Sequence, residues 1–315
     1  MRMQFDYVKW QRTERRERKN DVRFGTYHPA ITFRYFFAVI LFSCCFQHPV
    51  MLGISVVFSF MYSSYLNVRT KEYSNVGYEL LIILVRLTAV IAFVLLFACY
   101  YSYGHHFGMT YLRQNFVGNY ITLESFAYGL SIGIRIISVI LWLSCVHRIM
   151  TTDKIVYLFG RISPRISLYF AIIMRLIPNI REKGKKVNVA QTCIGKGTTQ
   201  GNMFVRLFHT FRMISILVTW TFEHIKESGD SMKSRGYTLK NRTAFSIYRF
   251  DNRDRTLVIW IFLLLTLVCV GTAFNQSTIV YNPVIFIQPI TALSFVFYGA
   301  YLAIMILPFW LDIKW

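Results

Sequence analysis

Acidic residues are scarce in this 315-residue sequence, with 15 aspartates and glutamates against 35 lysines and arginines. So few carboxylates disfavour the acidic metal clusters on which membrane transferases of lipid or prenyl substrates depend. Glycine and proline are also sparse, at 17 and 7 residues, which together with abundant aromatic side chains excludes a collagen-like or intrinsically disordered chain. The 6 cysteines form no C-x-x-C pair, so neither a metal site nor a disulfide framework is predicted.

Apolar residues are unusually frequent. They make up 55% of the chain and charged residues only 16%, whereas soluble domains average about 45 to 50% and about 25%. A bilayer core about 30 Å thick needs about 20 mostly apolar residues per helical span. The sequence therefore predicts an all-α integral membrane protein with about six transmembrane helices, the first two joined as a hairpin by Gln47-His48-Pro49. The six apolar stretches are 31–46, 50–66, 80–103, 127–150, 257–274 and 284–310.

Basic residues are distributed unevenly. Eight precede His28 and 20 lie from Arg148 to Arg255, where 7 acidic residues leave a net charge of +13. The presumed outer loops, 104–126 and 275–283, contain a single basic residue, Arg113. Because lysine and arginine mark cytoplasmic loops, both termini and the middle segment of this multi-pass cell-membrane protein are predicted to be cytoplasmic. The expected organisation is a basic N-terminal segment (1–29), four spans (30–150), a cytoplasmic module (151–255) and two last spans (256–315).

The middle segment has the periodicity of long helices. An apolar stretch at 168–177 is too short to span and is followed directly by Pro178, which predicts a buried or interfacial helix. Further on, apolar residues recur every three or four positions over about six turns. A helix of this kind lies either along the inner leaflet or beneath the bundle, with its ends presented to a soluble partner. The apolar positions are Phe204, Leu207, Phe208, Phe211, Ile214, Val218, Phe222 and Ile225.

Two glycine-containing sequences suggest exposed helix tips. Ser234-Arg235-Gly236 follows the amphipathic stretch, and a glycine there permits the left-handed backbone with which a helix ends. Ile194-Gly195-Lys196-Gly197 follows a basic stretch in a similar way. An exposed guanidinium binds carboxylates bidentately, so the two tips indicate contacts with acidic protein grooves rather than with nucleic acid. A phosphate-binding loop is not predicted, because Gly197 stands where the Walker motif requires serine or threonine.

Two arginines, Arg86 and Arg135, lie within predicted spans. An unpaired charge there costs at least about 2.5 to 3.5 kcal/mol. Each arginine is explained either by an interior ion pair or partner contact, or by snorkelling to the membrane surface. Snorkelling suits Arg86, near the inner end of its span, better than Arg135. The adjacent His105 and His106 lack further ligands, so they predict no metal site.

These residues together resemble a known family. The chain is similar to the transmembrane T component of energy-coupling factor (ECF) transporters, ABC-type importers of vitamins and transition-metal ions, a family that includes the cobalt transporter membrane subunit. Ser234-Arg235-Gly236 fits the family's Ala-Arg-Gly coupling motif with serine for alanine, whereas the first copy has Ile194 in place of arginine, with Lys196 two positions further on. The other similar residues are His28-Pro29, Thr32, His48-Pro49, Arg135, Thr151-Thr152-Asp153, Arg175, Pro178, Ala190-Gln191 and Arg242-Thr243.

The resemblance implies a non-catalytic coupling subunit that needs no cofactor or metal. Two cytoplasmic ABC ATPases would bind the tips, and a small membrane S component would carry the vitamin or metal-ion substrate, with membrane lipids around the bundle and no nucleic acid partner. ATP-driven closure of the ATPases would move the two helix tips, and this movement would tilt the S component in the membrane. The implied coupling residues are Ser234, Arg235, Gly236, Ile194, Gly195, Lys196 and Gly197, supported by Arg175, Pro178, Ala190, Gln191, Asp230 and Met232, with Arg135 and Arg86 as candidate S-component contacts.

Two alternatives stay open. One is an integral-membrane transferase, against which the scarcity of carboxylates argues. The other is a channel or a membrane anchor whose basic segment binds anionic lipid. Replacing Arg235 with lysine distinguishes the anchor hypothesis from the coupling-subunit hypothesis, because only a groove contact needs the planar guanidinium.

Overall fold

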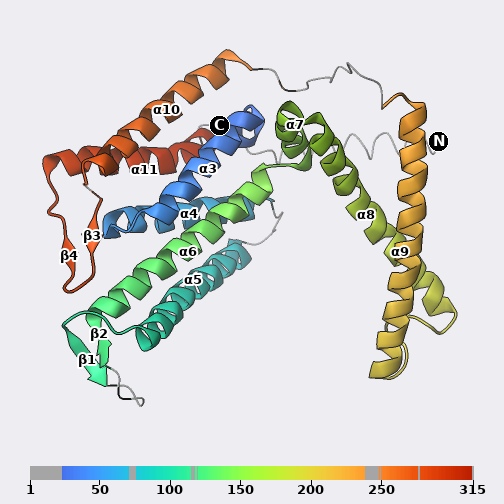
Figure 1. Cartoon of the computed structure of the whole chain (residues 1–315), viewed down its shortest axis with the longest axis horizontal. Coiled ribbons are helices and arrows are strands. Elements are labelled where there is room, and N and C mark those ends of the chain that lie inside the picture. The colour runs from blue at the N-terminus through green and yellow to red at the C-terminus, as the bar shows by residue number, and fades with distance from the viewer. Residues whose placement is uncertain are drawn as a thin grey trace. The chain divides into compact units, whose positions relative to one another are not determined.

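The computed structural model describes residues 23–70, 76–114, 118, 120–237, 248, 250–275 and 277–313. Within these residues the chain forms ten helices and two short antiparallel strand pairs (Figure 1). Contacts divide it into two units: Met1–Thr151 with Tyr248–Trp315, the bundle unit, and Thr152–Ile247, the middle unit. Most of the predicted N-terminal segment and the pair Arg242-Thr243 lie outside the described residues.

The bundle unit is built from seven of the described helices. α6 is central, because α3, α4 and α5 all pack against it, while α11 packs against α10 and α4. The predicted hairpin break is confirmed, since α3 ends at Cys45 and α4 begins at Pro49. The helices are α2 (Arg23–Thr26), α3 (Pro29–Cys45), α4 (Pro49–Thr70), α5 (Val76–Gly104), α6 (Leu123–Ile149), α10 (Asn252–Ala273) and α11 (Ala292–Ile313).

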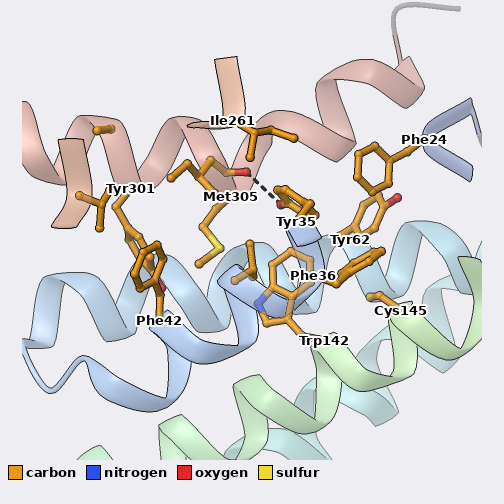
Figure 2. Packing of buried hydrophobic residues seen from close by; sticks show 14 of the residues in the cluster. Phe24, Tyr35, Phe36, Phe42, Tyr62, Trp142, Cys145, Ile261, Tyr301 and Met305 are labelled. Carbon is orange, nitrogen blue, oxygen red and sulfur yellow. Dashed lines mark hydrogen bonds between the residues drawn. The ribbon is translucent and has the colours of Figure 1, made fainter. Parts of the chain in front are cut away.

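Aromatic side chains form the core of the bundle unit (Figure 2). Phe24 of α2 lies edge-on to Tyr35 of α3, with 5.1 Å between the ring centroids. Trp142 of α6 is fully buried, and its ring lies 6.2 Å from that of Phe36. The Tyr35 hydroxyl donates to the Ile304 carbonyl oxygen of α11 at 2.9 Å. Four helices from distant parts of the sequence therefore share one core.

Two buried carboxylates bind the last two helices to the first described ones. Asp312, 3% exposed at the end of α11, accepts hydrogen bonds from the Phe24 N–H at 2.8 Å and the Tyr62 hydroxyl at 3.0 Å. Asp254, in the capping box that begins α10, accepts a hydrogen bond from the His28 N–H at 3.4 Å. The start of α10 and the end of α11 are thereby fixed against α2 and α3.

Six described helices are long and apolar enough to cross a membrane, as predicted for a multi-pass membrane protein. They are α4, α5, α6, α9 (Met203–Ser234), α10 and α11. The composition of this set differs from the prediction in two places. α3, the expected first span, has only 17 residues and falls short of the usual length. α9, expected to be an amphipathic helix outside the membrane, meets the criterion with the lowest mean hydropathy of the six, 1.2.

Short strands replace part of the predicted last span. β3 (Ile279–Val280) pairs with β4 (Phe286–Ile287), and α11 begins only at Ala292 rather than at residue 284. Pro289 lies inside the predicted apolar run, and a proline disfavours the helical conformation of the residue before it, which favours the later start. A second hairpin, β1 (Tyr111–Gln114) with β2 (Tyr120–Thr122), precedes α6.

The middle unit consists of α7 (Thr152–Ile162), α8 (Pro164–Cys193) and α9. α7 packs on the start of α8, where the rings of Phe159 and Phe170 stack with 5.2 Å between centroids. The apolar stretch 168–177 belongs to a 30-residue helix that continues through Pro178 to the first predicted tip. Proline removes one backbone donor, but the helix extends on both sides of it.

Candidate functional site

The tip around Arg235 is the end of α9. Arg235 caps the helix, and Gly236 adopts a left-handed φ of +76°. The Gly236 N–H donates to the Lys233 carbonyl at 3.0 Å, and the Tyr237 N–H donates to the Met232 carbonyl at 3.1 Å. These two bonds define a Schellman motif, which satisfies carbonyls that a helix end otherwise leaves unpaired.

The tip around Ile194 has the same backbone structure at the end of α8. Ile194 caps the helix, and Gly195 has a φ of +75°. The Gly195 N–H donates to the Thr192 carbonyl at 3.1 Å, and the Lys196 N–H donates to the Gln191 carbonyl at 2.9 Å. Both predicted tips are therefore Schellman motifs with glycine in the left-handed position.

The shared motif gives a residue-by-residue correspondence between the tips. Ile194 occupies the capping position that Arg235 has in the other tip, and Gly195 matches Gly236. Ile194 is 67% exposed, so the first tip presents an apolar side chain where the second presents a guanidinium. Lys196 is exposed but sits at the position of Tyr237. The positive charge of the first tip is therefore displaced along the chain.

Gly197 has a packing role in the loop after the first tip. It is buried, and a Cβ at this position would lie 2.4 Å from the Thr192 hydroxyl oxygen. Its N–H donates to the Gln200 side-chain oxygen at 3.0 Å, and the Thr198 hydroxyl donates to the Asn188 side-chain oxygen at 3.0 Å. The loop folds back on the end of α8, so Gly197 allows this turn rather than offering a contact surface.

Two basic residues near the tips pair with carboxylates of their own helix, whereas Arg235 does not. Lys186 donates to Glu182 at 2.8 Å and lowers the pKa of that carboxyl, and Lys233 lies 3.7 Å from Asp230. Arg235 is exposed and has no ion pair with any described residue. Its guanidinium is therefore available to a carboxylate of another protein.

α8 and α9 cross between the two tips (Figure 1). A Cβ on Gly184 of α8 would lie 3.5 Å from a methyl carbon of Leu217 of α9, so the helices approach closely there. The Lys183 ammonium lies 5.1 Å above the Trp220 ring centroid, a cation–π contact across the same crossing. The crossing lies about 14 Å before the end of α8 and about 26 Å before the end of α9, and the two tips lie on opposite sides of it (Figure 1).

The supporting residues occupy different positions along these helices. Gln191 and Met232 are equivalent, because the carbonyl of each accepts the longer-range bond of its Schellman motif. Arg175, Pro178 and Ala190 are exposed on α8. The Ser234 hydroxyl donates to the Ser231 carbonyl at 2.9 Å, which leaves it directed at its own helix.

α9 has an uncovered apolar face. The predicted positions all lie in this helix, none of its residues is buried, and Phe204 is 88% exposed. The predicted helix is therefore present, and no other residue of the described part of the middle unit covers its apolar positions. An exposed apolar face along a whole helix marks a contact with lipid or with another protein.

The two in-span arginines differ in their surroundings. Arg86 of α5 donates to the Ser63 hydroxyl of α4 at 2.9 Å and to the Ser63 carbonyl at 3.4 Å, so it has an interior hydrogen-bond partner. Arg135 lies midway along α6, and its Nε is buried without a hydrogen-bond partner among the described residues. Glu124, the carboxylate nearest to it in sequence at a span end, instead accepts from the Thr110 N–H at 3.3 Å.

Sequence reasoning missed the two acids that organise the bundle, Asp254 and Asp312. A signal was present, because each carboxylate lies at the edge of an apolar run in a chain with few carboxylates. Their partners, a backbone N–H of residue 24 or 28 and the Tyr62 hydroxyl, come from more than 200 residues away and leave no trace in local sequence.

Comparison with known proteins does not identify the chain: no family model matches it, and no curated protein is significantly similar to it. In the described part of the chain, no three histidine, cysteine, aspartate or glutamate residues are grouped so as to hold a metal ion.

Proposed function

We propose that this chain is the membrane-embedded, non-catalytic coupling subunit of an ECF-type ABC importer. In this proposal two cytoplasmic ATPases bind the ends of α8 and α9, and a small membrane S component carries a vitamin or a transition-metal ion. The bundle unit anchors the assembly in the cell membrane, with both termini cytoplasmic.

One observation carries the proposal: two long crossed helices end in the same glycine-closed motif, at opposite ends of the pair. Duplicated ends of this kind suit two copies of one sort of partner, or two related ones, bound side by side. The path from one tip to the other through the crossing is about 40 Å long, which leaves room for one globular domain at each end. The unequal side chains, Arg235 and Ile194, predict that the two partners bind with unequal strength.

The mechanism follows from the crossing. A partner that holds a rigid helix end transmits its own movement along the helix, so closure of two ATPases would change the angle at which α8 and α9 cross. Gly184 has no side chain to obstruct Leu217 at the crossing, so we expect the helices to rotate about this point without separating. The uncovered face of α9, which includes Phe208 and Phe222, is where we place the S component.

We assign α9 to the cytoplasmic side of the membrane rather than to its interior. As a span it would carry Arg206 and Arg212 into the bilayer, and a mid-membrane arginine costs at least about 2.5 to 3.5 kcal/mol. If α3 also spans, α9 would be a seventh span and would place the two ends of the chain on opposite sides, against the distribution of basic residues. α3, although short, then serves as the first of six spans.

The test is the substitution Arg235→Ala, with Arg212→Ala on the exposed surface of the same helix as the matched control. Removing an arginine that pairs with a buried carboxylate of a partner costs about 2 to 5 kcal/mol, which weakens binding by a factor of about 30 or more. ATPase co-purification and substrate uptake should fall for Arg235→Ala and persist for Arg212→Ala, at equal membrane levels. Unchanged uptake and assembly for Arg235→Ala would refute the proposal.

A membrane anchor is the competing function, favoured by the basic flank of α9 and its uncovered apolar face. Arg235→Lys separates the two, because lysine keeps the charge but loses the planar fork. A groove contact predicts clear loss of ATPase binding for Arg235→Lys. An anchor predicts no change in any property.

A further inference from the structure

An open groove lies between α10 and α11 in the bundle unit. It has a volume of about 800 Å³ and is lined by 13 mostly apolar residues, of which Arg23 and Arg253 are charged and Tyr27 and Thr256 carry hydroxyl groups. A volume of this order is typical of sites that hold a small molecule. The groove opens outward, since Trp260 and Trp310 on its two sides are 58% and 53% exposed.

The groove occupies only one end of the helix pair, and packing at the other end explains why. A Cβ on Gly271 of α10 would lie 2.5 Å from a ring carbon of Phe297 of α11, so the helices touch closely there. The groove lies toward the start of α10 and the end of α11, where its lining residues run from Arg253 to Leu264 on α10 and from Leu302 to Leu311 on α11.

The length of the groove matches one leaflet of a bilayer. Arg253 and Leu264 are separated by eleven residues, about 16 Å along a helix, which is half of the roughly 30 Å hydrocarbon core. An acyl chain of a lipid in that leaflet would lie along the groove from end to end. A ligand long enough to cross the whole membrane would extend beyond the end of the groove.

One end of the groove is basic and aromatic. Arg253 lies in the first turn of α10, and Arg23 begins α2, which is held to α11 by the Phe24–Asp312 hydrogen bond. Arg253 also lies 3.5 Å from Asp251, but both side chains are largely exposed, and an exposed pair of this kind contributes little and exchanges readily for another anion. Trp310 lies at the same end, as aromatic residues do at the headgroup level of membranes.

We propose that this groove binds one anionic phospholipid of the leaflet on that side, with an acyl chain along α10 and α11 and the phosphate between Arg23 and Arg253. Two cations at the mouth of an apolar trough complement a negatively charged headgroup followed by hydrocarbon. The site couples the lipid to the junction of α2, α10 and α11. This inference depends only on the chain being a membrane protein and not on the coupling function.

The experiment is native mass spectrometry of the full chain, purified in mild detergent and titrated with phosphatidylglycerol or with phosphatidylcholine of the same acyl chains. Arg253→Gln should weaken phosphatidylglycerol binding about fivefold, the contribution of one basic residue near a membrane surface. The matched control is Arg255→Gln, which removes an exposed arginine of the same helix that does not line the groove. It should leave the binding unchanged.

A second variant tests the hydrocarbon part. Ala303→Trp fills the groove, whereas Ala92→Trp adds the same bulk to an exposed position of α5. Each displaced methylene weakens binding about fourfold, so Ala303→Trp should weaken the binding of either lipid about tenfold or more while Ala92→Trp does not. Equal affinity for both lipids in the unsubstituted protein, equal effects of Arg253→Gln and Arg255→Gln, or tight lipid binding by Ala303→Trp would each overturn the proposal. The proposal would also be overturned if a second copy of the chain, or another protein, were found bound in the groove in place of lipid.

Discussion

Asp312→Ala should destabilise the bundle unit more than any other single loss of a polar side chain in the described residues. Asp312 is buried at the end of α11 and accepts hydrogen bonds from the Phe24 N–H at 2.8 Å and from the Tyr62 hydroxyl at 3.0 Å. These bonds join α11 to α2 and α4. Alanine removes the acceptor and leaves both donors without a partner in a closed site.

The magnitude follows from the number and kind of these bonds. A hydrogen bond to a charged group contributes about 1.5 to 3 kcal/mol, and an orphaned buried donor costs about 1 to 3 kcal/mol. With two bonds that share one acceptor, we expect Asp312→Ala to cost about 3 to 5 kcal/mol, the range of a strongly destabilising substitution. Tyr62→Phe removes one donor and leaves the Phe24 bond, so about 1 to 2 kcal/mol is expected.

The assay is thermal unfolding of the purified protein in one detergent, followed by tryptophan fluorescence. At about 2 °C per kcal/mol for a chain of this size, Asp312→Ala should lower the midpoint by about 6 to 10 °C and Tyr62→Phe by about 2 to 4 °C. In the Asp312→Ala background, Tyr62→Phe should cost almost nothing, because its partner is already gone.

Two results would refute this reasoning. A midpoint for Asp312→Ala within 1 °C (about 0.5 kcal/mol) of the unsubstituted protein would mean that the carboxylate is not a structural acceptor. Fully additive effects of Asp312→Ala and Tyr62→Phe would mean that the two side chains do not share a bond.

Further substitutions test the helix packing and the tips. Gly236→Val should speed hydrogen exchange of the following amide about 5- to 30-fold, because a left-handed non-glycine residue costs about 1 to 2 kcal/mol; a rate within twofold would contradict the motif. Gly129→Ala should lower the melting midpoint, since its Cβ would lie 2.9 Å from a side-chain carbon of α5, whereas Gly53→Ala, with nothing within 4 Å, should leave it equal or higher. Ile194→Arg should tighten ATPase binding in a pull-down, because it gives the first tip the guanidinium of the second; unchanged or weaker binding would argue against equivalent tips.

Helix positions were largely predictable because their signal is local. The break at Gln47-His48-Pro49 and the helix beginning near Phe204 follow from proline and from apolar spacing over a few turns. The glycine-closed ends at Gly195 and Gly236 were also predictable, because a glycine directly after a helical stretch is typical of the left-handed backbone with which a helix ends. The structure adds the correspondence of Ile194 with Arg235, which the spacing of residues left open.

What the sequence did not reveal depends on contacts between distant residues or on competition between local preferences. The partners of Asp312 are 288 and 250 residues away, so no local pattern marks them. The β3–β4 hairpin takes the place of the predicted start of the last span, where Pro289 disfavours helix in an apolar run. α8 passes through Pro178 although proline usually ends a helix, and apolar contact with α7, such as Phe159 with Phe170, stabilises it on one side.

The central claim is that this chain couples two ATPases to a separate membrane partner. Purification of the full chain in mild detergent from its own cells, followed by mass spectrometry of the co-eluting chains, tests it most directly. The account predicts two ATPase subunits, or two copies of one, together with one small membrane protein. The Arg235→Ala variant should lose the ATPase bound at the end of α9 and keep the small membrane protein. Elution of the chain without any ATPase, in a preparation that retains its bound lipid, would contradict it.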